Sequence, residues 1–209
     1  MNRTRKLITV SALAALVAIG TGCITEETGV EIVIRDAYCM AFDESHESET
    51  FVTPRTVYLA DELDQVLEDN DVSREDLVRG GMIAASYEVT EPPAHDWTLT
   101  GGITVERTDI AAGPDTLLTY TSQSLMGAYG APVFAVLREE GVTLINDALE
   151  DYIAEQDPVL LFKVVNGDCI PNPSASDQLV FEWEACVNYY VVVAETLDVY
   201  DFYPGSPTD

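Results

Sequence analysis

Lysine is almost absent from this sequence. Only Lys6 and Lys163 occur among 209 residues, and the ten Lys and Arg residues face 37 Asp and Glu residues, giving a formal net charge of −27. Nucleic-acid binding depends on clustered Lys and Arg that neutralise phosphates, so we expect no nucleic-acid partner. Anionic lipid headgroups would repel the folded region as well.

Sequence motifs typical of catalytic sites are also scarce. The chain has two histidines, His46 and His95, and no G-x-S-x-G motif of a nucleophile elbow. Gly101 and Gly102 fall within an expected strand rather than in a phosphate-binding loop. We therefore predict that the protein is not an enzyme. A hydrolase that combines one histidine with a distant Ser and an acid is the least favoured alternative.

The N-terminus shows the order of features typical of a secretory signal. Basic residues within positions 3–6 are followed by residues 7–19, a run of thirteen residues without charge, and then by small residues up to Cys23. The apolar run is shorter than the roughly 20 residues that a transmembrane helix needs. Residues 1–22 are therefore predicted to be a signal peptide.

The run Gly20-Thr21-Gly22-Cys23 resembles the lipobox of bacterial lipoproteins. The resemblance covers residues 1–23 only and says nothing about the folded domain. It implies that the Cys23 thiol carries diacylglycerol, that cleavage occurs just before Cys23, and that the new amino terminus is acylated, which together give stable anchoring. Because Gly20 stands where an aliphatic residue is usual, two alternatives remain: ordinary cleavage after Gly20, and an uncleaved anchor extending to Ile24.

The residue after the cysteine is Ile24 rather than Asp. By resemblance to the sorting of Gram-negative lipoproteins, this favours the outer membrane, on its periplasmic or surface face. Three of the ten basic residues and no acidic ones lie within residues 1–22, so the processed chain has 7 basic against 37 acidic residues, a net charge of −30. The lipid would then be the domain's attachment to the membrane.

The same acidity fits exposure to a saline medium, because salt screens self-repulsion within a highly charged fold. The alternative is an acidic exported protein with no salt adaptation. A melting series in NaCl separates the two, since flat stability from low to molar salt would contradict salt adaptation.

Hydrophobic residues make up 47% of the chain, enough to bury a sizeable core. We expect residues 23–29 to form a lipidated tether, residues 30–203 a single β-rich domain, and residues 204–209 a frayed tail. Alternating or β-branched runs predict strands, and spacing of three and four predicts helices. The expected strands cover residues 30–42, 51–59, 82–90, 97–108, 117–121, 159–165, 179–188 and 189–199, with one long bent strand over the last two ranges as the alternative.

Two helical interludes interrupt the strands. Apolar residues at helical spacing predict a helix over residues 61–68, and Ser73 with Asp76 suggests a capping box that opens a short helix to residue 79. A second long helix is predicted from Pro132 to Glu155, bent at Gly141. The fold class is therefore mainly β: an antiparallel β-sandwich, or a curved sheet, with two helical insertions. An α+β fold is the alternative.

Three cysteines follow Cys23: Cys39, Cys169 and Cys186. Export favours oxidation, so we expect one disulfide and one buried thiol. Cys169–Cys186 is the first choice because the two flank an expected hairpin, and Cys39–Cys186 is the second. No Cys/His spacing fits zinc.

Two acidic segments are weak metal candidates. The expected loop over residues 43–50 offers Asp43, Glu44, Glu47 and Glu49, oxygen ligands of the kind Ca²⁺ prefers, but it has no glycines to fold it around an ion. Residues 69–73 imitate the start of an EF-hand and then fail at the required glycine and glutamate positions. We therefore predict a capped turn there, and no metal or other cofactor, with Ca²⁺ as the minor alternative.

Aromatic side chains could form a platform for a glycan or peptide, although aromatics in strands usually pack in the core. The candidates are Trp97, Trp183, Tyr189, Tyr190, Tyr200, Phe202 and Tyr203, with Trp183 expected in the core. The sequence leads to a cell-envelope lipoprotein with a non-enzymatic structural or interaction domain and an envelope protein or glycan as partner. A glycan-, peptide- or lipid-binding module, with Ca²⁺ as a stabilising ion, is the second hypothesis.

Overall fold

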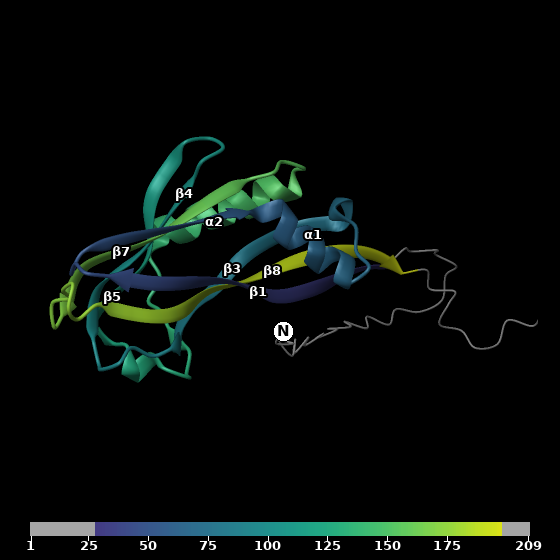
Figure 1. Ribbon diagram of the computed structural model, residues 1–209. Helices are drawn as coiled ribbons and strands as arrows, with labels where there is room; N and C mark the ends of the chain where they lie inside the picture. The colour runs from purple at the N-terminus through teal and green to yellow at the C-terminus, as the bar shows by residue number, and fades with distance from the viewer. Residues whose placement is uncertain (1–27, 198–209) are drawn as a thin grey trace, which may run out of the picture.

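The computed structural model describes residues 28–197. Two four-stranded sheets with antiparallel ladders, in the orders β1-β8-β3-β6 and β2-β7-β4-β5, face each other as a sandwich (Figure 1). The predicted mainly-β fold with two helical insertions is confirmed. The elements are β1 (Thr28–His46), β2 (Phe51–Tyr58), α1 (Leu59–Asp69), η1 (Arg74–Asp76), β3 (Leu77–Glu91), β4 (Thr98–Arg107), β5 (Ala112–Ser124), η2 (Met126–Ala128), β6 (Val133–Phe134), α2 (Glu139–Ile153), β7 (Val159–Ile170) and β8 (Leu179–Leu197).

The longest ladder joins β1 and β8, which pair in one unbroken register over 19 residues each. Between Leu179 and Val191 the side chains of β8 alternate: Phe181, Trp183 and Ala185 are buried, whereas Glu182 lies on the solvent side. This period of two places one face of the strand on the core. The two strands expected over residues 179–199 are therefore one strand, the alternative that the sequence left open, as far as Leu197; residues 198–199 lie outside the described residues.

The two helices fill the space between the sheets at the end where β1 begins. Leu63 of α1 and Ile145 and Leu149 of α2 meet Phe162 of one sheet and Val187 of the other around a shared small cavity. The helices therefore belong to the inter-sheet core. Within residues 28–197 no helix combines the length and apolarity required to cross a membrane.

The second helix starts later than its sequence suggested. Residues before Glu139 include the two-residue strand β6, which pairs with β3, so the predicted start at Pro132 was wrong. Gly141 serves close packing: a Cβ there would lie 2.5 Å from the Leu117 Cα. The predicted short helix that Ser73 opens is present as η1, but its predicted end at residue 79 is wrong, because the chain joins β3 at Leu77 and pairs with β8.

Several predicted features lie outside the described residues. These are the signal segment, Cys23 and the tail, together with the aromatic candidates Tyr200, Phe202 and Tyr203.

Candidate functional site

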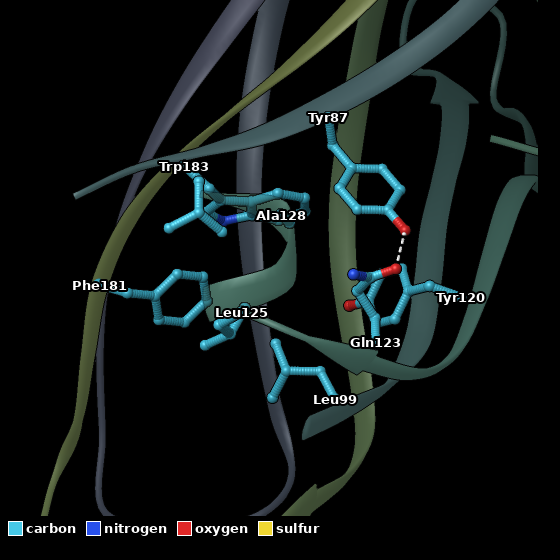
Figure 2. A pocket seen from close by; sticks show the side chains of 9 residues that line it. Tyr87, Leu99, Tyr120, Gln123, Leu125, Ala128, Phe181 and Trp183 are labelled. Atoms are coloured by element: carbon cyan, nitrogen blue, oxygen red, sulfur yellow. Dashed lines mark hydrogen bonds between the residues drawn. The ribbon is translucent and has the colours of Figure 1, made fainter. Parts of the chain in front are cut away.

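A small pocket lies between the sheets at the end remote from the two α-helices. Figure 2 shows its lining, which comes from β3, β4, β5, β8 and the segment that includes η2. The lining residues are Tyr87, Val89, Leu99, Tyr120, Gln123, Leu125, Ala128, Phe181 and Trp183. The centre of a water molecule has about 20 Å³ of room inside it, which is enough for one water and too little for a sugar or an acyl chain.

Two tyrosines give the pocket its polar character. The Tyr87 hydroxyl donates to Oε1 of Gln123 at 2.8 Å, whereas the buried Tyr120 hydroxyl has no hydrogen-bond partner among residues 28–197. Figure 2 shows the Tyr120 hydroxyl turned toward the middle of the pocket. Burial raises the pKa of Tyr120 far above its ordinary value, and the negative charge of Glu44 raises it further. The hydroxyl therefore stays protonated.

Gly101 makes room for the Tyr120 ring. A Cβ at Gly101 would lie 3.0 Å from the Tyr120 hydroxyl and 2.3 Å from the carbonyl oxygen of Val165. On the other side of Gly101, Asn166 has a buried Oδ1 that also lacks a partner in the described part of the chain, although its amide nitrogen donates to two backbone carbonyls. Two unsatisfied polar atoms thus flank one glycine, an uncommon arrangement in a protein interior.

The aromatic side chains here pack against one another in the core. The Trp183 ring lies 5.3 Å from Phe42 and 6.1 Å, edge to face, from Tyr87, distances typical of favourable aromatic pairs. Trp183 is buried, as expected, and so are Trp97 and Tyr189. The described members of the aromatic set therefore do not form an exposed platform, with Tyr190 half-buried.

A buried carboxylate lies behind Trp183. Glu44 is 2% exposed and accepts three hydrogen bonds, from Nε2 of His46 at 2.5 Å, Oγ1 of Thr53 at 2.7 Å and Nε1 of Trp183 at 3.2 Å. These donors come from β1, β2 and β8, so the carboxylate ties the two sheets together. A buried charge needs such partners because its desolvation is costly.

Neither histidine forms a nucleophile–base–acid arrangement within residues 28–197. His46 and Thr53 contact the same oxygen of Glu44, so the Thr53 hydroxyl donates to the carboxylate and not to the imidazole. The His46 ring also stacks on Phe51 at 3.8 Å. His95 lies 3.4 Å from a carboxylate oxygen of Asp177 and stacks on a tryptophan, with no Ser hydroxyl bonded to it. A triad requires a chain of contacts from hydroxyl to imidazole to acid.

The four carboxylates proposed as weak calcium ligands do not form a common site. The segment around Asp43 and Glu44 is part of strand β1, not of a loop, because its backbone pairs with β8 up to His46. Asp43 is therefore exposed on one side of the strand and Glu44 buried on the other.

The other two members of that set are Glu47 and Glu49. Glu47 accepts a hydrogen bond from Gln178, and the backbone carbonyl of Glu49 accepts one from Asn166. Among residues 28–197 the one cluster with ligand-like spacing is Cys39, Cys186 and Glu184. Its two sulfurs are bonded to each other, which leaves a single carboxylate.

The disulfide joins Cys39 to Cys186, so the first-choice pair Cys169–Cys186 was wrong and the second choice is correct. The two residues oppose each other in the β1–β8 ladder with their Cα atoms 4.0 Å apart, although 147 positions separate them in sequence. Cys169 is the buried free thiol, and burial, followed by the charges of Asp168 and Glu49, raises its pKa to about 11. Such a thiol is unreactive.

The EF-hand-like segment is a capped turn, as predicted. It connects α1 to η1, and the Ser73 amide donates to Oδ2 of Asp76 at 3.3 Å, which is half of a capping box.

No sequence pattern pointed to Tyr87, Tyr120, Gln123 or Asn166 as members of a site. Each is a lone polar residue in a strand pattern and carries no motif. Gly101 was the one feature of the sequence that pointed to this region, since a glycine inside a strand often marks a place where another group comes close to the backbone.

No protein-family model and no curated protein matches the chain. Among solved structures, a chain titled "TURNIP YELLOW MOSAIC VIRUS" aligns over 92% of this chain and 93% of that one, with 9% identity and a TM-score of 0.24. A likeness this distant carries no argument about function.

Proposed function

We propose that this protein is an exported lipoprotein of the bacterial cell envelope, anchored through Cys23, whose β-sandwich acts as a structural or interaction domain and not as an enzyme. The observation that carries the proposal is the run of uncharged residues that ends in Gly20-Thr21-Gly22-Cys23. Ile24 after the cysteine favours the outer membrane.

The disulfide supports an exported location. Cys39 is exposed, and its bond to Cys186 lies on the solvent side of the sheet, where a reducing cytosol would have access to it. Disulfides persist in oxidising compartments such as the periplasm and the cell surface. The bond is therefore consistent with a chain that leaves the cytoplasm.

The position of the first strand supports a short tether. β1 begins at Thr28, five residues after Cys23, so a fully extended tether would hold that end of the strand within about 17 Å of the lipidated residue. A domain of high negative charge is repelled by anionic headgroups. The acyl chains would then be the attachment that keeps the domain at the membrane.

The experiment compares the natural chain with Cys23→Ser in a Gram-negative host grown with a labelled fatty acid. We expect the natural chain to take up label and to sediment with membranes, and Cys23→Ser to lose both properties. Cys169→Ser is the matched control, because it removes a thiol that is buried and unbonded and should leave both unchanged. Processing and membrane binding that survive in Cys23→Ser would contradict the proposal.

A second candidate is a ligand-binding module, favoured by the pocket with the unpartnered Tyr120 hydroxyl. In its present form the pocket admits a water at most, so a larger ligand would require Leu125 and Ala128 to move aside. Nuclear magnetic resonance with phenol as the probe tests this candidate. Shifts confined to the pocket and absent in Ala128→Leu, which fills it, would support it, and no shifts at millimolar phenol would contradict it.

A further inference from the structure

Strand β1 has a long open edge. Within residues 28–197 β1 pairs with β8 alone, so β1 is the edge strand of its sheet, and its side away from β8 is unpaired over much of its 19 residues (Figure 1). Exposed edges are usually protected by proline, lysine, a bulge or an inward-pointing charge. β1 contains no proline or lysine, its register with β8 shows no bulge, and its buried carboxylate, Glu44, lies in the last three residues of the strand.

Two observations show which backbone groups face the open edge. The Cα atoms of Cys39 and Cys186 are only 4.0 Å apart, the short spacing of a pair that exchanges no hydrogen bonds. The odd-numbered residues of β1 therefore direct their N–H and C=O groups away from β8. Accordingly, the Ala37 amide donates to its neighbour's carboxylate, Oδ1 of Asp36, at 2.8 Å. This amide at the open edge therefore bonds to an adjacent side chain and not to a second strand.

The charges on this edge are unusual for so acidic a chain. Seven cations follow residue 22. Six of them have a hydrogen bond or ion pair: Arg55, Arg74, Arg79, Arg107, Arg138 and Lys163. The seventh, Arg35, is exposed and has no such contact within the described chain. An unpaired cation among so many carboxylates calls for an explanation.

Asp43 is the acidic counterpart on the same strand. It is exposed, eight residues from Arg35 and therefore on the same face of the strand. In the sheet it stands directly opposite Glu182, which in turn stands opposite Glu91. The charge of Glu91, and to a lesser extent that of Asp43, raises the pKa of Glu182. This row of like charges lacks a cation within residues 28–197.

We propose that β1 pairs antiparallel with β1 of a second copy of this chain, about a two-fold axis at Cys39, so that the two sheets become one continuous sheet. In this register Arg35 of each copy lies opposite Asp43 of the other, and Ala37 lies opposite Ala41. A shift of two residues either way would place Arg35 opposite Ala41 or Ser45 and lose both ion pairs. The charges therefore select one register, and the small side chains around the axis leave room for close approach.

The pairing is compatible with two lipid anchors, although it does not depend on them. The axis at Cys39 places the two Thr28 ends at opposite ends of the paired strands, each about 36 Å from the axis. Both anchors reach one membrane when the axis stands along the membrane normal. A failure of dimerisation would leave the lipoprotein proposal untouched.

The test uses the chain from residue 23 onward with Cys23→Ser, studied by sedimentation equilibrium in about 0.15 M NaCl, where a Debye length of about 8 Å screens the long-range repulsion between two acidic copies more than it screens ion pairs in contact. We expect a concentration-dependent dimer. Arg35→Asp and Asp43→Arg should each weaken it at least about tenfold, since each removes two symmetry-related ion pairs and introduces repulsion. The double variant Arg35→Asp, Asp43→Arg should restore dimerisation. Arg138→Asp is the charge-matched control on a distant surface.

A second variant tests the backbone pairing itself. Ala37→Pro removes an amide that does not bond to β8, so it should leave the fold intact, as judged by circular dichroism, and weaken the dimer by at least tenfold. A chain that stays monomeric at millimolar concentration overturns the proposal. So does a dimer that tolerates Ala37→Pro, or one that the double charge variant does not restore.

Discussion

Removing the Tyr120 hydroxyl should increase the stability of the fold, whereas most substitutions in a protein interior decrease it. Tyr120 and Tyr87 line the same pocket and are equally buried, each 7% exposed. Of the two hydroxyls, that of Tyr87 alone has a partner among the described residues, Oε1 of Gln123. Removing one oxygen from each ring therefore compares a bonded with an unbonded hydroxyl in a single environment.

We expect Tyr120→Phe to stabilise the protein by about 1 kcal/mol, because an unsatisfied buried polar group costs about 1–3 kcal/mol and the lost oxygen contacts offset part of that. Tyr87→Phe should destabilise it by about 1 kcal/mol, since it breaks a hydrogen bond and leaves the Gln123 acceptor unpaired. For a domain of this size, each kcal/mol corresponds to roughly 2–4 °C in melting temperature.

Urea unfolding followed by fluorescence measures both changes, and an unchanged slope with denaturant shows that the unfolded state is not altered. The Tyr120→Phe midpoint should rise and the Tyr87→Phe midpoint should fall. If both variants lose stability equally, the Tyr120 hydroxyl has a partner, such as a trapped water, and the reasoning about the pocket is refuted.

Three further predictions follow from buried groups and close contacts. Burial raises the pKa values of Tyr120 and Tyr189 in the folded state above the ordinary value near 10. Because the unfolded chain therefore loses these protons at lower pH than the folded chain, the urea midpoint should fall as pH rises above about 10. The fall should be less steep in Tyr120→Phe, which has one such group fewer. A midpoint that does not change between about pH 9 and pH 11 would contradict this. Breaking the Cys39–Cys186 bond, which spans 147 positions, should lower the stability of the fold by about 4–5 kcal/mol, because the bond restricts the unfolded chain. Calorimetry of the double variant Cys39→Ala, Cys186→Ala measures this loss. An unchanged melting temperature would show that the bond does not form. Gly141→Ala should destabilise the folded protein by about 2 kcal/mol, because the new Cβ meets backbone atoms of Leu117 and Thr116 within 2.8 Å. Gly167→Ala is the control, because a Cβ there lies 3.7 Å from its nearest neighbour. Equal losses of stability in the two variants would argue against the close contact between α2 and β5.

The fold class could be predicted because the strand signal is local. The alternation of Phe181, Trp183 and Ala185 with polar neighbours specifies a half-buried strand without any knowledge of its partner. The start of α2 could not be placed, because residues 132–138 satisfy their backbone through β3 and Leu117, contacts that no local pattern reveals.

The site was less predictable, since its members meet only in the folded chain. The disulfide depends on the register of two strands from opposite ends of the sequence, so an apparent hairpin around Cys169 was the better local guess and the wrong one. Asp43 and Glu44 looked like one acidic cluster, yet the pleat of β1 sends them to opposite sides.

Lipidation of Cys23 is tested by mass spectrometry of the N-terminal peptide of protein purified from membranes. We expect a peptide that begins at Cys23 and carries the added mass of diacylglycerol and an N-linked acyl chain. An unmodified peptide that begins at Thr21, or one that retains the residues before Gly20, would contradict it.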